Sequence, residues 1–491
     1  MAKGGRDMGR KKKKEVIVKS VGNSHNDVTG SCFEVSYPKK EGVGKLIIEC
    51  GMIQENGTIL EDYNINKKMV EHIDFKNAEH IFICHSHVDH TGNLMAAIPR
   101  GFTGTVITTQ ANKEISRELL LDTAFIHIKN VKALQGIGKQ IKPLYTEQDA
   151  HVILDRMKTF EVNEIHKINE YVSFRYVANS HVVGSTSLEL FIRKPSGQII
   201  KIFYSSDLGS VVNKKIQPFL SEQQTVTKAN ISIFESTYGN KEGFTKDEAI
   251  QERKSLIKTV KEYTGNGHRV LIPCFSYSRS QTILELLYRN LKDDEKFKDV
   301  MVVIDSRLTN AINEVYRRIL SDEDREYWNE ILSWKNIKRI KEFKETGTFV
   351  AKKDTPMVIL SSSGMINAGH SVVWAKSILE NKNDCIIFTG FCHPRTIGGK
   401  ILNEKQKTVT IDGMVYTKKC KIRKFRTFTS HAQKSDLIAY AKQMNCQKIL
   451  IHHGSQEVRE SLRDSMKEEL YKIGKTTQVV LIDKKNNCFK L

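Results

Sequence analysis

A short segment of the chain places three histidines and an aspartate within six residues. His85, His87, Asp89 and His90 stand in the run IFICHSHVDHTG, directly after an apolar stretch. A short loop after a strand can direct four such side chains toward one point, and imidazole nitrogen with carboxylate oxygen suits zinc. The alternative, a chance cluster of polar loop residues, does not explain why a strand leads directly into it. The pattern offers more ligands than one open catalytic zinc requires, so it predicts a pair of metal ions.

Three further candidate ligands stand where other strand-like runs end. His181 occurs in ANSHVVGST, Asp207 in YSSDLGS and His453 in ILIHHGSQ. Each alone could be structural, but together with HxHxDH they supply the ligands of a two-metal centre. Asp207 is the natural bridge, because a carboxylate can span two cations about 3.5–4 Å apart. Adjacent strand residues point to opposite faces, so we assign His453 to the metals and a structural role to His452.

The pattern of predicted strands and helices that must position these residues changes along the chain. As far as Phe234 the chain is dominated by short strand-like runs, and after Gly239 strands and helices alternate, which predicts a parallel sheet flanked by helices. From about Lys421 short strands return and complete the first domain, so we expect the middle domain to be an insertion. The first part is predicted to contain strands at Val16–Val21, Lys45–Cys50, His80–Cys84, Thr105–Thr109, Val172–Val177, Leu188–Ile192, Ile199–Tyr204 and Ile231–Phe234 and a helix at Ala111–Leu121. The middle part is predicted to contain strands at Val270–Cys274, Val300–Ile304, Met357–Leu360 and Cys385–Thr389 and helices at Lys246–Tyr263, Gln281–Leu291, Ala311–Leu320 and Val372–Leu379. The last part is predicted to contain helices at Ser435–Gln443 and Gln456–Lys472.

Composition limits the classes of partner and compartment. The 491 residues include 77 basic and 57 acidic side chains, and the formal net charge of +20 predicts a polyanionic partner, nucleic acid first and a membrane surface as the alternative. No run approaches 18 apolar residues, so we expect no membrane span. The basic start of the chain lacks a secretory signal pattern, and Lys11–Lys14 are expected to form a disordered arm. Nine scattered cysteines without a CxxC pair predict reduced thiols in a cytoplasmic protein.

The ordered motifs resemble a known family. HSHVDH, ANSHVVGS and SSDLG are similar, in this order, to the metal motifs of the metallo-β-lactamase superfamily. ESTYGN, TFTSHAQKSDL and KILIHHGSQE resemble the signature motifs of its β-CASP group of nucleic-acid-processing nucleases, and IPCFSYSRSQ, IDSRLTNAINEVYR, SSSGMINAGH and FTGFCHPRTIGGK extend the match. The chain looks more like the cleavage and polyadenylation endonuclease and its prokaryotic relatives than like the RNase J branch. The resemblance covers roughly residues 15–470.

The resemblance implies both a fold and a domain division. The fold is expected to be of the α/β class, a metallo-β-lactamase αββα sandwich with an inserted β-CASP domain. We place a basic arm at residues 1–14, the sandwich at 15–239 and 421–491, and the insertion at 240–420.

The resemblance also implies roles for the site residues. His85, His87 and His181 would hold one zinc, Asp89, His90 and His453 the other, and Asp207 would bridge them, with Mn²⁺ as an alternative metal. His431 would be the general acid and Glu235 would orient it, since a histidine held by a carboxylate can protonate a leaving oxygen. The alternative for His431 is a surface or supporting histidine. Glu49 stands where the family usually has aspartate, and its longer side chain could shift metal affinity.

The middle domain is expected to hold the substrate. Ser361, Ser362, Ser363 and Gly364 lie between a predicted strand and helix, where free backbone N–H groups favour phosphate, although helix capping is an equal alternative. Arg279 begins another helix. The Gly-rich basic loop of Thr396, Gly398 and Lys400 completes the predicted substrate-binding set.

These expectations define a leading hypothesis and its alternatives. The leading hypothesis is a zinc-dependent ribonuclease, acting as an endonuclease, a 5′–3′ exonuclease or both, on single-stranded RNA through a two-metal-activated hydroxide, and leaving 3′-hydroxyl and 5′-phosphate ends. In the resembled group a histidine at the third motif accompanies RNA enzymes, so His453 favours RNA. The alternatives are a DNA nuclease of the same fold and an inactive scaffold subunit of an RNA-processing complex. Relatives often dimerise, which makes a homodimer an open expectation.

Overall fold

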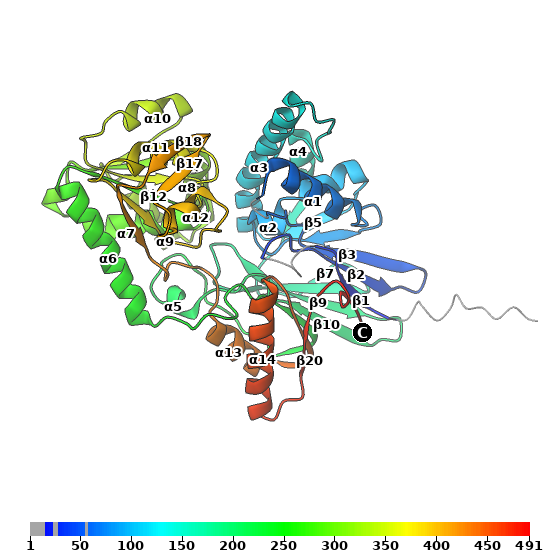
Figure 1. Cartoon of the computed structure of the whole chain (residues 1–491). Helices are drawn as coiled ribbons and strands as arrows, with labels where there is room; N and C mark the ends of the chain where they lie inside the picture. The colour runs from blue at the N-terminus through cyan, green and yellow to red at the C-terminus, as the bar shows by residue number, and fades with distance from the viewer. Residues whose placement is uncertain (1–14, 23–27, 55–56) are drawn as a thin grey trace, which may run out of the picture. The chain divides into compact units, whose positions relative to one another are not determined.

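The computed structural model describes residues 15–22, 28–54 and 57–491. The predicted arm at residues 1–14 lies outside the described residues. The chain divides into two compact units (Figure 1). Unit 1 comprises Met1–Ser210, Ser221–Gly243 and His431–Leu491, and unit 2 comprises Val211–Leu220 and Phe244–Ser430. Unit 2 therefore continues beyond the predicted boundary at residue 420 and includes a short segment from within the predicted first domain.

The first sheet of unit 1 has the strand order β22-β1-β2-β3-β4-β5-β6. The strands from β22 to β3 pair antiparallel, whereas those from β3 to β6 pair parallel. The motif HSHVDH begins at His85, shortly after β4 ends at Phe82. The strands are β1 (Ile17–Ser20), β2 (Phe33–Pro38), β3 (Val43–Ile48), β4 (His80–Phe82), β5 (Thr105–Thr108), β6 (Met157–Thr159) and β22 (Cys488–Lys490).

The second sheet of unit 1 has the order β21-β20-β11-β10-β9-β8-β7. β10, β11, β20 and β21 run parallel, and β8 shares their direction because β8 and β10 are each antiparallel to β9. The carboxyl ends of β8, β10, β11 and β20 therefore lie at one edge. The strands are β7 (His166–Lys167), β8 (Val172–Ala178), β9 (Thr186–Arg193), β10 (Ile199–Tyr204), β11 (Lys228–Phe234), β20 (Asn445–Ile451) and β21 (Gln478–Leu481).

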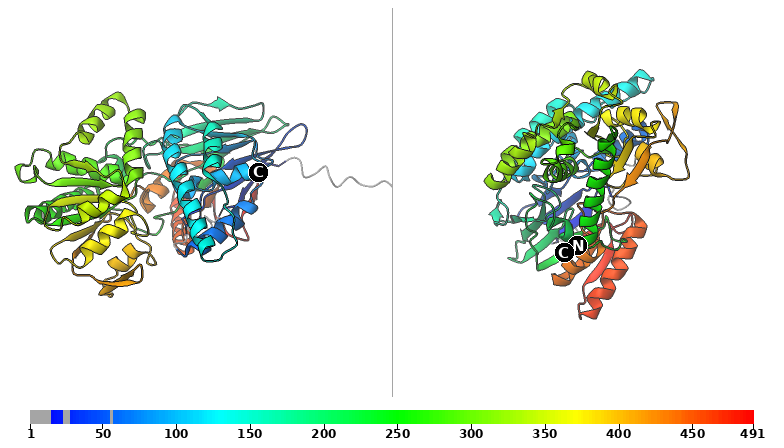
Figure 2. Two further views of the ribbon diagram at one scale, coloured as in Figure 1. Left: turned by 90° about the horizontal axis from the view of Figure 1, so that it is seen from above. Right: turned by 90° about the vertical axis from the view of Figure 1, so that its left-hand side faces the viewer.

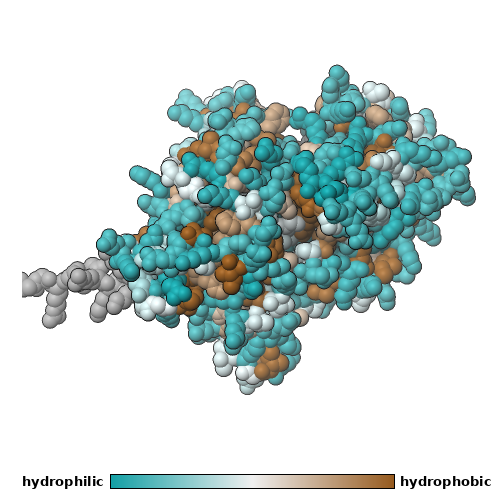
Figure 3. Space-filling view, turned by 180° about the vertical axis from the view of Figure 1, so that it is seen from behind, coloured by the Kyte–Doolittle hydropathy of each residue, from teal (hydrophilic) through white to brown (hydrophobic). Residues whose placement is uncertain are grey.

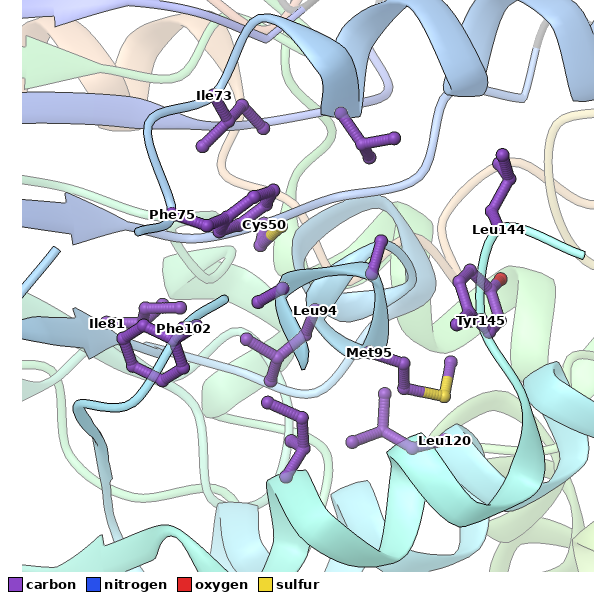
Figure 4. Close-up of a cluster of buried hydrophobic side chains, with 14 of the residues drawn as sticks. Cys50, Ile73, Phe75, Ile81, Leu94, Met95, Phe102, Leu120, Leu144 and Tyr145 are labelled. Carbon is purple, nitrogen blue, oxygen red and sulfur yellow. The ribbon is translucent and has the colours of Figure 1, made fainter. Parts of the chain in front are cut away.

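Three apolar cores separate the layers of unit 1. One lies between the two sheets and joins residues such as Phe33 and Leu188. A second packs the first sheet against helices and includes Leu94, Met95 and Leu120 (Figure 4). A third packs the second sheet against the C-terminal helices. The layer order is therefore helices, sheet, sheet, helices. The helices on the first sheet are α1 (Ile59–Glu71), α2 (Val88–Thr91), η2 (Leu94–Arg100), α3 (Gln110–Gly136) and α4 (Glu147–Asp155), and those on the second are α13 (Lys434–Gln443) and α14 (Gln456–Lys472).

Unit 2 is built on a parallel sheet with the order β14-β13-β15-β12-β16-β19, which helices flank (Figure 2). The fully buried pair Arg269–Asp384, 2.6 Å apart, ties the start of β12 to the turn before β16. The strands are β12 (Arg269–Pro273), β13 (Met301–Asp305), β14 (Ile337–Arg339), β15 (Met357–Ser361), β16 (Cys385–Phe388) and β19 (Lys421–Lys424), with a separate hairpin of β17 (Thr408–Ile411) and β18 (Met414–Thr417). The helices are α5 (Val211–Lys214), α6 (Lys246–Gly265), α7 (Arg279–Leu291), η3 (Glu295–Phe297), α8 (Arg307–Ile319), α9 (Asp322–Leu332), α10 (Phe343–Val350), α11 (His370–Leu379) and α12 (Ile397–Leu402).

Helix starts follow local capping chemistry. Thr58, Thr146 and Thr245 each accept a hydrogen bond from the third residue of the following helix, whose acidic side chain accepts one in return. These capping boxes satisfy backbone N–H groups that the first turn leaves without partners. Helix α3 extends well beyond the predicted end at residue 121, and strand β2 and helices α1 and α4 were not predicted.

The surface seen in Figure 3 is largely hydrophilic, with scattered apolar side chains. Among the described residues, no helix combines the length and apolar character needed to traverse a bilayer.

Candidate metal centre

Both sheets of unit 1 deliver polar side chains to the same region. The loop after β4 carries His85, His87, Asp89 and His90, and the second sheet contributes His181 after β8, Asp207 after β10 and His453 after β20. The structure thus brings together side chains that the sequence separates by more than 360 residues.

The first cluster consists of His85, His87, His181 and Asp207, whose candidate ligand atoms all lie within 4.8 Å of one another. The Nε2 atoms of His85 and His181 are 3.5 and 3.7 Å from Oδ2 of Asp207. Separations of this size exceed a hydrogen bond, and they suit atoms that converge on a common ion.

The second cluster consists of Asp89, His90, His453 and again Asp207. Oδ1 of Asp207 lies 3.3 Å from Nε2 of His90 and 3.6 Å from Nδ1 of His453. Asp89 Oδ2 is 3.4 Å from Nε2 of His453. Asp207 therefore turns one carboxylate oxygen toward each cluster, as a bridging ligand would.

Unsatisfied polar atoms test whether a cation fits here. Among the described residues, Nε2 of His85, His90, His181 and His453 and Oδ1 of Asp207 are buried without a hydrogen-bond partner. Buried polar atoms are normally paired, because an unpaired one costs roughly 1–3 kcal/mol. Four imidazole nitrogens and one carboxylate oxygen have the composition of a metal-ligand set, so the residues present fit a metal cofactor.

Burial and neighbouring charges tune the ligands. Burial, together with His85, lowers the pKa of His87 to about 3. Burial and nearby His431 hold the pKa of His181 well below its ordinary value. For Asp207, burial raises the pKa, but His453 and His90 outweigh this effect and hold it well below the usual range. His87, His181 and Asp207 are thus deprotonated near neutrality, which is the form that binds metals.

His431 and Glu235 lie beside the first cluster. His431 Nδ1 is 3.3 Å from Oε2 of Glu235 and 4.0 Å from Oδ2 of Asp207. Burial alone would lower the pKa of His431, but the carboxylates of Glu235 and Asp207 raise it to about 9. Its side chain is 21% exposed whereas Glu235 is fully buried. His431 is therefore a partly accessible imidazole whose ring lies beside a buried carboxylate.

Glu49 belongs to neither four-residue cluster, but it forms a third group with His85 and His90 whose candidate ligand atoms lie within 4.8 Å of one another. Its Oε1 is 3.6 Å from Nδ1 of His90 and accepts a hydrogen bond from the backbone N–H of Cys84. The glutamate thus contacts the ring nitrogen of His90 that faces away from Asp207. His452 belongs to neither ligand cluster. Its ring centroid lies 5.1 Å from that of Phe33 and 5.6 Å from that of Tyr204.

Two hydroxyl groups that support ligands were missed in the sequence. Ser206 Oγ lies 3.1 Å from Nδ1 of His85, and Thr237 Oγ1 lies 3.0 Å from Nδ1 of His453. Ser206 holds the ring nitrogen of His85 that faces away from Asp207, and Thr237 holds Nδ1 of His453, whose Nε2 has no hydrogen-bond partner among the described residues. Such contacts orient a metal ligand. Both are small hydroxyl residues within two positions of another site residue, and this proximity is the signal that could have identified them.

Tight backbone approaches hold the loops together. A Cβ on Gly209 would lie 2.2 Å from the carbonyl carbon of Ser180, so the loop after β10 can pass the His181 loop only as glycine. Gly209 also forms an isolated bridge with His431. Ser180, Ser206 and His453 have positive φ values of 60°, 52° and 59°, a conformation that costs free energy and tends to occur at functional sites.

The predicted substrate residues lie in unit 2, and two of the expectations about them are wrong. Ser361 ends β15, and helix α11 begins only at His370 after an N-cap at Gly369, so the serines do not cap it. The hydroxyl of Ser361 donates to the carbonyl of Asp305, and that of Ser362 donates to the hydroxyl of Ser306. The hydroxyl of Ser363 accepts hydrogen bonds from the backbone N–H groups of residues 367 and 368.

The second correction concerns the Gly-rich segment. Thr396 caps α12, accepting a hydrogen bond from Gly399 N–H, so Gly398 and Lys400 are helical rather than part of a loop. Arg279 does begin α7, as predicted, and its guanidinium donates to the carbonyl of Thr389.

Comparisons with known proteins agree with this geometry. Residues 280–401 match the Beta-Casp domain, and residues 415–479 match the Zn-dependent metallo-hydrolase RNA specificity domain. The chain is similar to transcription termination factor FttA of Methanocaldococcus jannaschii, at 24% identity over 95% of this chain and 73% of the relative. It is 25% identical to an RNase J-like protein of the same organism, over 86% of this chain and 89% of the relative. Cleavage and polyadenylation specificity factor 73 of Drosophila melanogaster is 24% identical over 94% of this chain, which spans 63% of that relative.

The fold and the site define a metal-dependent hydrolase with a metallo-β-lactamase core and an inserted β-CASP domain. The predicted resemblance to the β-CASP nucleases is thereby confirmed, and so are the predicted fold class and the assignment as an enzyme.

Proposed function

We propose that the chain is a zinc-dependent ribonuclease that hydrolyses phosphodiester bonds of single-stranded RNA and leaves 3′-hydroxyl and 5′-phosphate ends. The observation that carries the proposal is the shared carboxylate: Asp207 belongs to two four-residue ligand clusters of histidine and aspartate. The names of the relatives add support, because they include an RNase J-like protein and a cleavage and polyadenylation factor.

The residues present would hold two zinc ions. His85, His87 and His181 would ligate one, Asp89, His90 and His453 the other, and Asp207 both. When bound, such a pair supplies Lewis-acid activation of water and neutralises charge on a phosphate. Mn²⁺ is the alternative metal, and elemental analysis of the purified protein distinguishes it from zinc.

The chain's own residues would handle the proton. Cleavage creates an alkoxide on the departing ribose, which a general acid must protonate. His431 carries a proton near neutrality, because its pKa is raised to about 9, and Glu235 fixes its ring. Bound dications would bring that pKa down toward the working pH, because like charges disfavour the protonated ring. His431 would thus donate to the leaving oxygen.

Unit 2 would contribute RNA binding. Arg279 at the start of α7 and Lys400 in α12 supply positive charge, while Ser361, Ser362, Ser363 and Gly364, with Thr396 and Gly398, supply polar groups around the carboxyl ends of β15 and β16. A cytoplasmic location and a homodimer are further proposals, the first resting on the reduced thiols and the second testable by light scattering.

The test combines metal analysis with one cleavage assay. Purified protein should contain two zinc ions per chain, which elemental analysis measures, and should cut a single-stranded RNA carrying a label at either end. End-labelled fragments of intermediate length from either label would indicate endonuclease action, whereas release of the 5′ label as a mononucleotide would indicate 5′–3′ exonuclease action. Cleavage of single-stranded DNA but not RNA would overturn the RNA assignment. A zinc-loaded protein inactive on both would support a scaffold instead.

A further inference from the structure

Exposed aromatic side chains mark two neighbouring loops of unit 2. Phe275 follows β12 and is 46% exposed, and Phe391 follows β16 and is 51% exposed. β12 and β16 pair in parallel, with Leu271 opposite Ile386, so both loops leave the same edge of the sheet. Phe275 is four residues after Leu271, and Phe391 is five residues after Ile386, so the two phenylalanines follow this pair at similar distances along the chain.

A glycine from a third loop lies close to both. A Cβ on Gly364 would come within 3.2 Å of ring carbons of Phe275, so the bare backbone of Gly364 backs one side of that ring. The carbonyl of Gly364 accepts a hydrogen bond from the thiol of Cys392, the residue after Phe391, at 3.8 Å. Phe275 and the residue after Phe391 therefore both contact Gly364, and each of the two phenylalanines retains about half of its surface in solvent.

Positive charge accompanies the pair. A Cβ on Gly390 would lie 3.5 Å from Nη1 of Arg279, which places that guanidinium beside the loop of Phe391. Edge strand β19 pairs with β16, bringing Lys424 opposite Phe388, and Arg423 and Lys424 are exposed. The loops at 274–278, 362–369 and 389–396, all of which the structure describes, contain no aspartate or glutamate. A flexible polyanion would thus meet cations without opposing charge.

Exposed aromatic rings beside cations and free of acidic groups are the combination that binds single-stranded nucleic acid, because every base has a face that can stack. We propose that Phe275 and Phe391 are stacking positions for unpaired nucleobases of the substrate, with Arg279 and the β19 cations contacting the adjacent phosphates. This inference rests on the proposed ribonuclease function and adds two residues that determine how the strand is held.

The test is a double-mutant cycle between ring and base. Full-length, zinc-loaded His431→Ala protein should cleave RNA roughly 10²–10⁴-fold more slowly. Fluorescence anisotropy measures its affinity for a short labelled oligouridylate before cleavage becomes appreciable. Phe275→Leu and Phe391→Leu should each weaken binding by about 5- to 100-fold, the range found when one stacked base loses its platform. Replacing one uridine with an abasic ribose should weaken binding to a similar extent in the parent, yet add little in the leucine variant whose ring it contacts.

Two controls separate stacking from damage to the fold. Phe275→Tyr and Phe391→Tyr keep the ring and should keep most of the affinity. Phe125→Leu alters a side chain that is 45% exposed on helix α3 of unit 1 and should leave RNA affinity unchanged. Unchanged affinity in the Phe275 and Phe391 leucine variants, or additive effects of ring and abasic site, would overturn the stacking role and leave a protein-contact role for these rings. A parent protein that binds no RNA at low salt would instead overturn the ribonuclease proposal on which the inference rests.

Discussion

At the scale of single residues, Asp207 and His431 have different proposed roles. Asp207 is the proposed shared ligand of both clusters, and His431 is the proposed general acid. Asp207 is nearly fully buried and its two oxygens face different histidines, so its removal affects both clusters. His431 lies at the margin, with a carboxylate behind it and part of its ring in solvent. Removing either residue should therefore have different consequences for metal content and for catalysis.

Asp207→Ala should lose zinc and abolish RNA cleavage, because both ions lose a shared ligand. His431→Ala should retain two zinc ions while turnover falls by roughly 10²–10⁴-fold, the usual contribution of a general acid. Elemental analysis and initial rates measure both quantities. His166→Ala, which removes a histidine of strand β7 that belongs to no ligand cluster of the described residues, serves as the control. Normal turnover in His431→Ala would remove this residue from the proton-transfer step.

His127 makes the stability of unit 1 dependent on pH. Its ring stacks on Tyr145 at 4.3 Å, its Nε2 accepts the backbone N–H of Leu144, and burial lowers its pKa to about 4. In the unfolded chain the pKa is near 6.5, so below that pH the unfolded state binds the proton more tightly and stability declines as pH falls toward 4. At pH 5 the loss should be about 2 kcal/mol.

Urea unfolding at pH 7 and pH 5 measures this effect. His127→Gln cannot take up the proton, so the difference in unfolding free energy between the two pH values should shrink by about 2 kcal/mol relative to the parent. An exposed histidine provides the matched comparison: His151→Gln on α4 should leave the difference unchanged. Equal pH dependence in parent and His127→Gln would contradict the assignment.

At the scale of elements, the metal centre is made by strand ends. β4 of one sheet and β8, β10, β11 and β20 of the other finish near one another, and each is followed by a site residue. A strand end is a rigid support whose position the whole sheet fixes. The hydroxyl groups of Ser206 and Thr237, which contact the Nδ1 atoms of His85 and His453, extend that support to the imidazole rings.

Thr237→Val should therefore weaken zinc binding without unfolding the protein. The change keeps the shape of the side chain but removes the hydroxyl 3.0 Å from Nδ1 of His453, and loss of such a partner typically costs 10–100-fold in metal affinity. Competition with a chromophoric chelator measures the affinity. Thr264→Val removes a buried hydroxyl bonded to a helix carbonyl in unit 2 and should not alter zinc binding. Equal affinities for the two variants would show that Thr237 does not orient the ligand.

The fold class could be predicted from the sequence through its ordered motifs, and the residues predicted as ligands lie together in the structure because each follows a strand. HxHxDH is dense, and His181, Asp207 and His453 each follow an apolar run that the structure contains as a strand. The alternation of strands and helices after residue 239 likewise predicted the parallel sheet of unit 2.

Features that depend on tertiary contacts escaped prediction. The hydroxyl of Thr237 reaches His453 across 216 residues, and its position two residues after Glu235 does not indicate which side chain it contacts. The serines after β15 resembled a helix cap until the structure showed a long turn before α11. Helix α3 was predicted too short because several polar residues after Leu121 obscured its periodicity.

At the scale of the whole molecule, charge should dominate RNA binding. The net charge is +20, and hydrophilic side chains cover most of the face in Figure 3. The logarithm of the association constant should fall linearly with the logarithm of salt concentration, by about 0.7 for each phosphate that a cation neutralises on a single strand. Anisotropy titrations across a series of salt concentrations measure the slope.

A pair of lysine variants localises that charge. Lys424→Gln, on the exposed edge strand of unit 2, should reduce the slope by about 0.7. Lys472→Gln alters a lysine of α14 that pairs with Glu468 and Glu469 at 2.8 Å and should leave the slope as it was. A flat salt response in the parent would refute the electrostatic account.

The order in which the ligands occur along the chain has a consequence for biosynthesis. The second cluster needs His453, which β20 carries in beside β11 from near the far end of the sequence. Translation must pass that position before the complete ligand set can exist. A nascent polypeptide that has not yet been extended past His453 therefore lacks one ligand of the second cluster, and so does a product that terminates before that position.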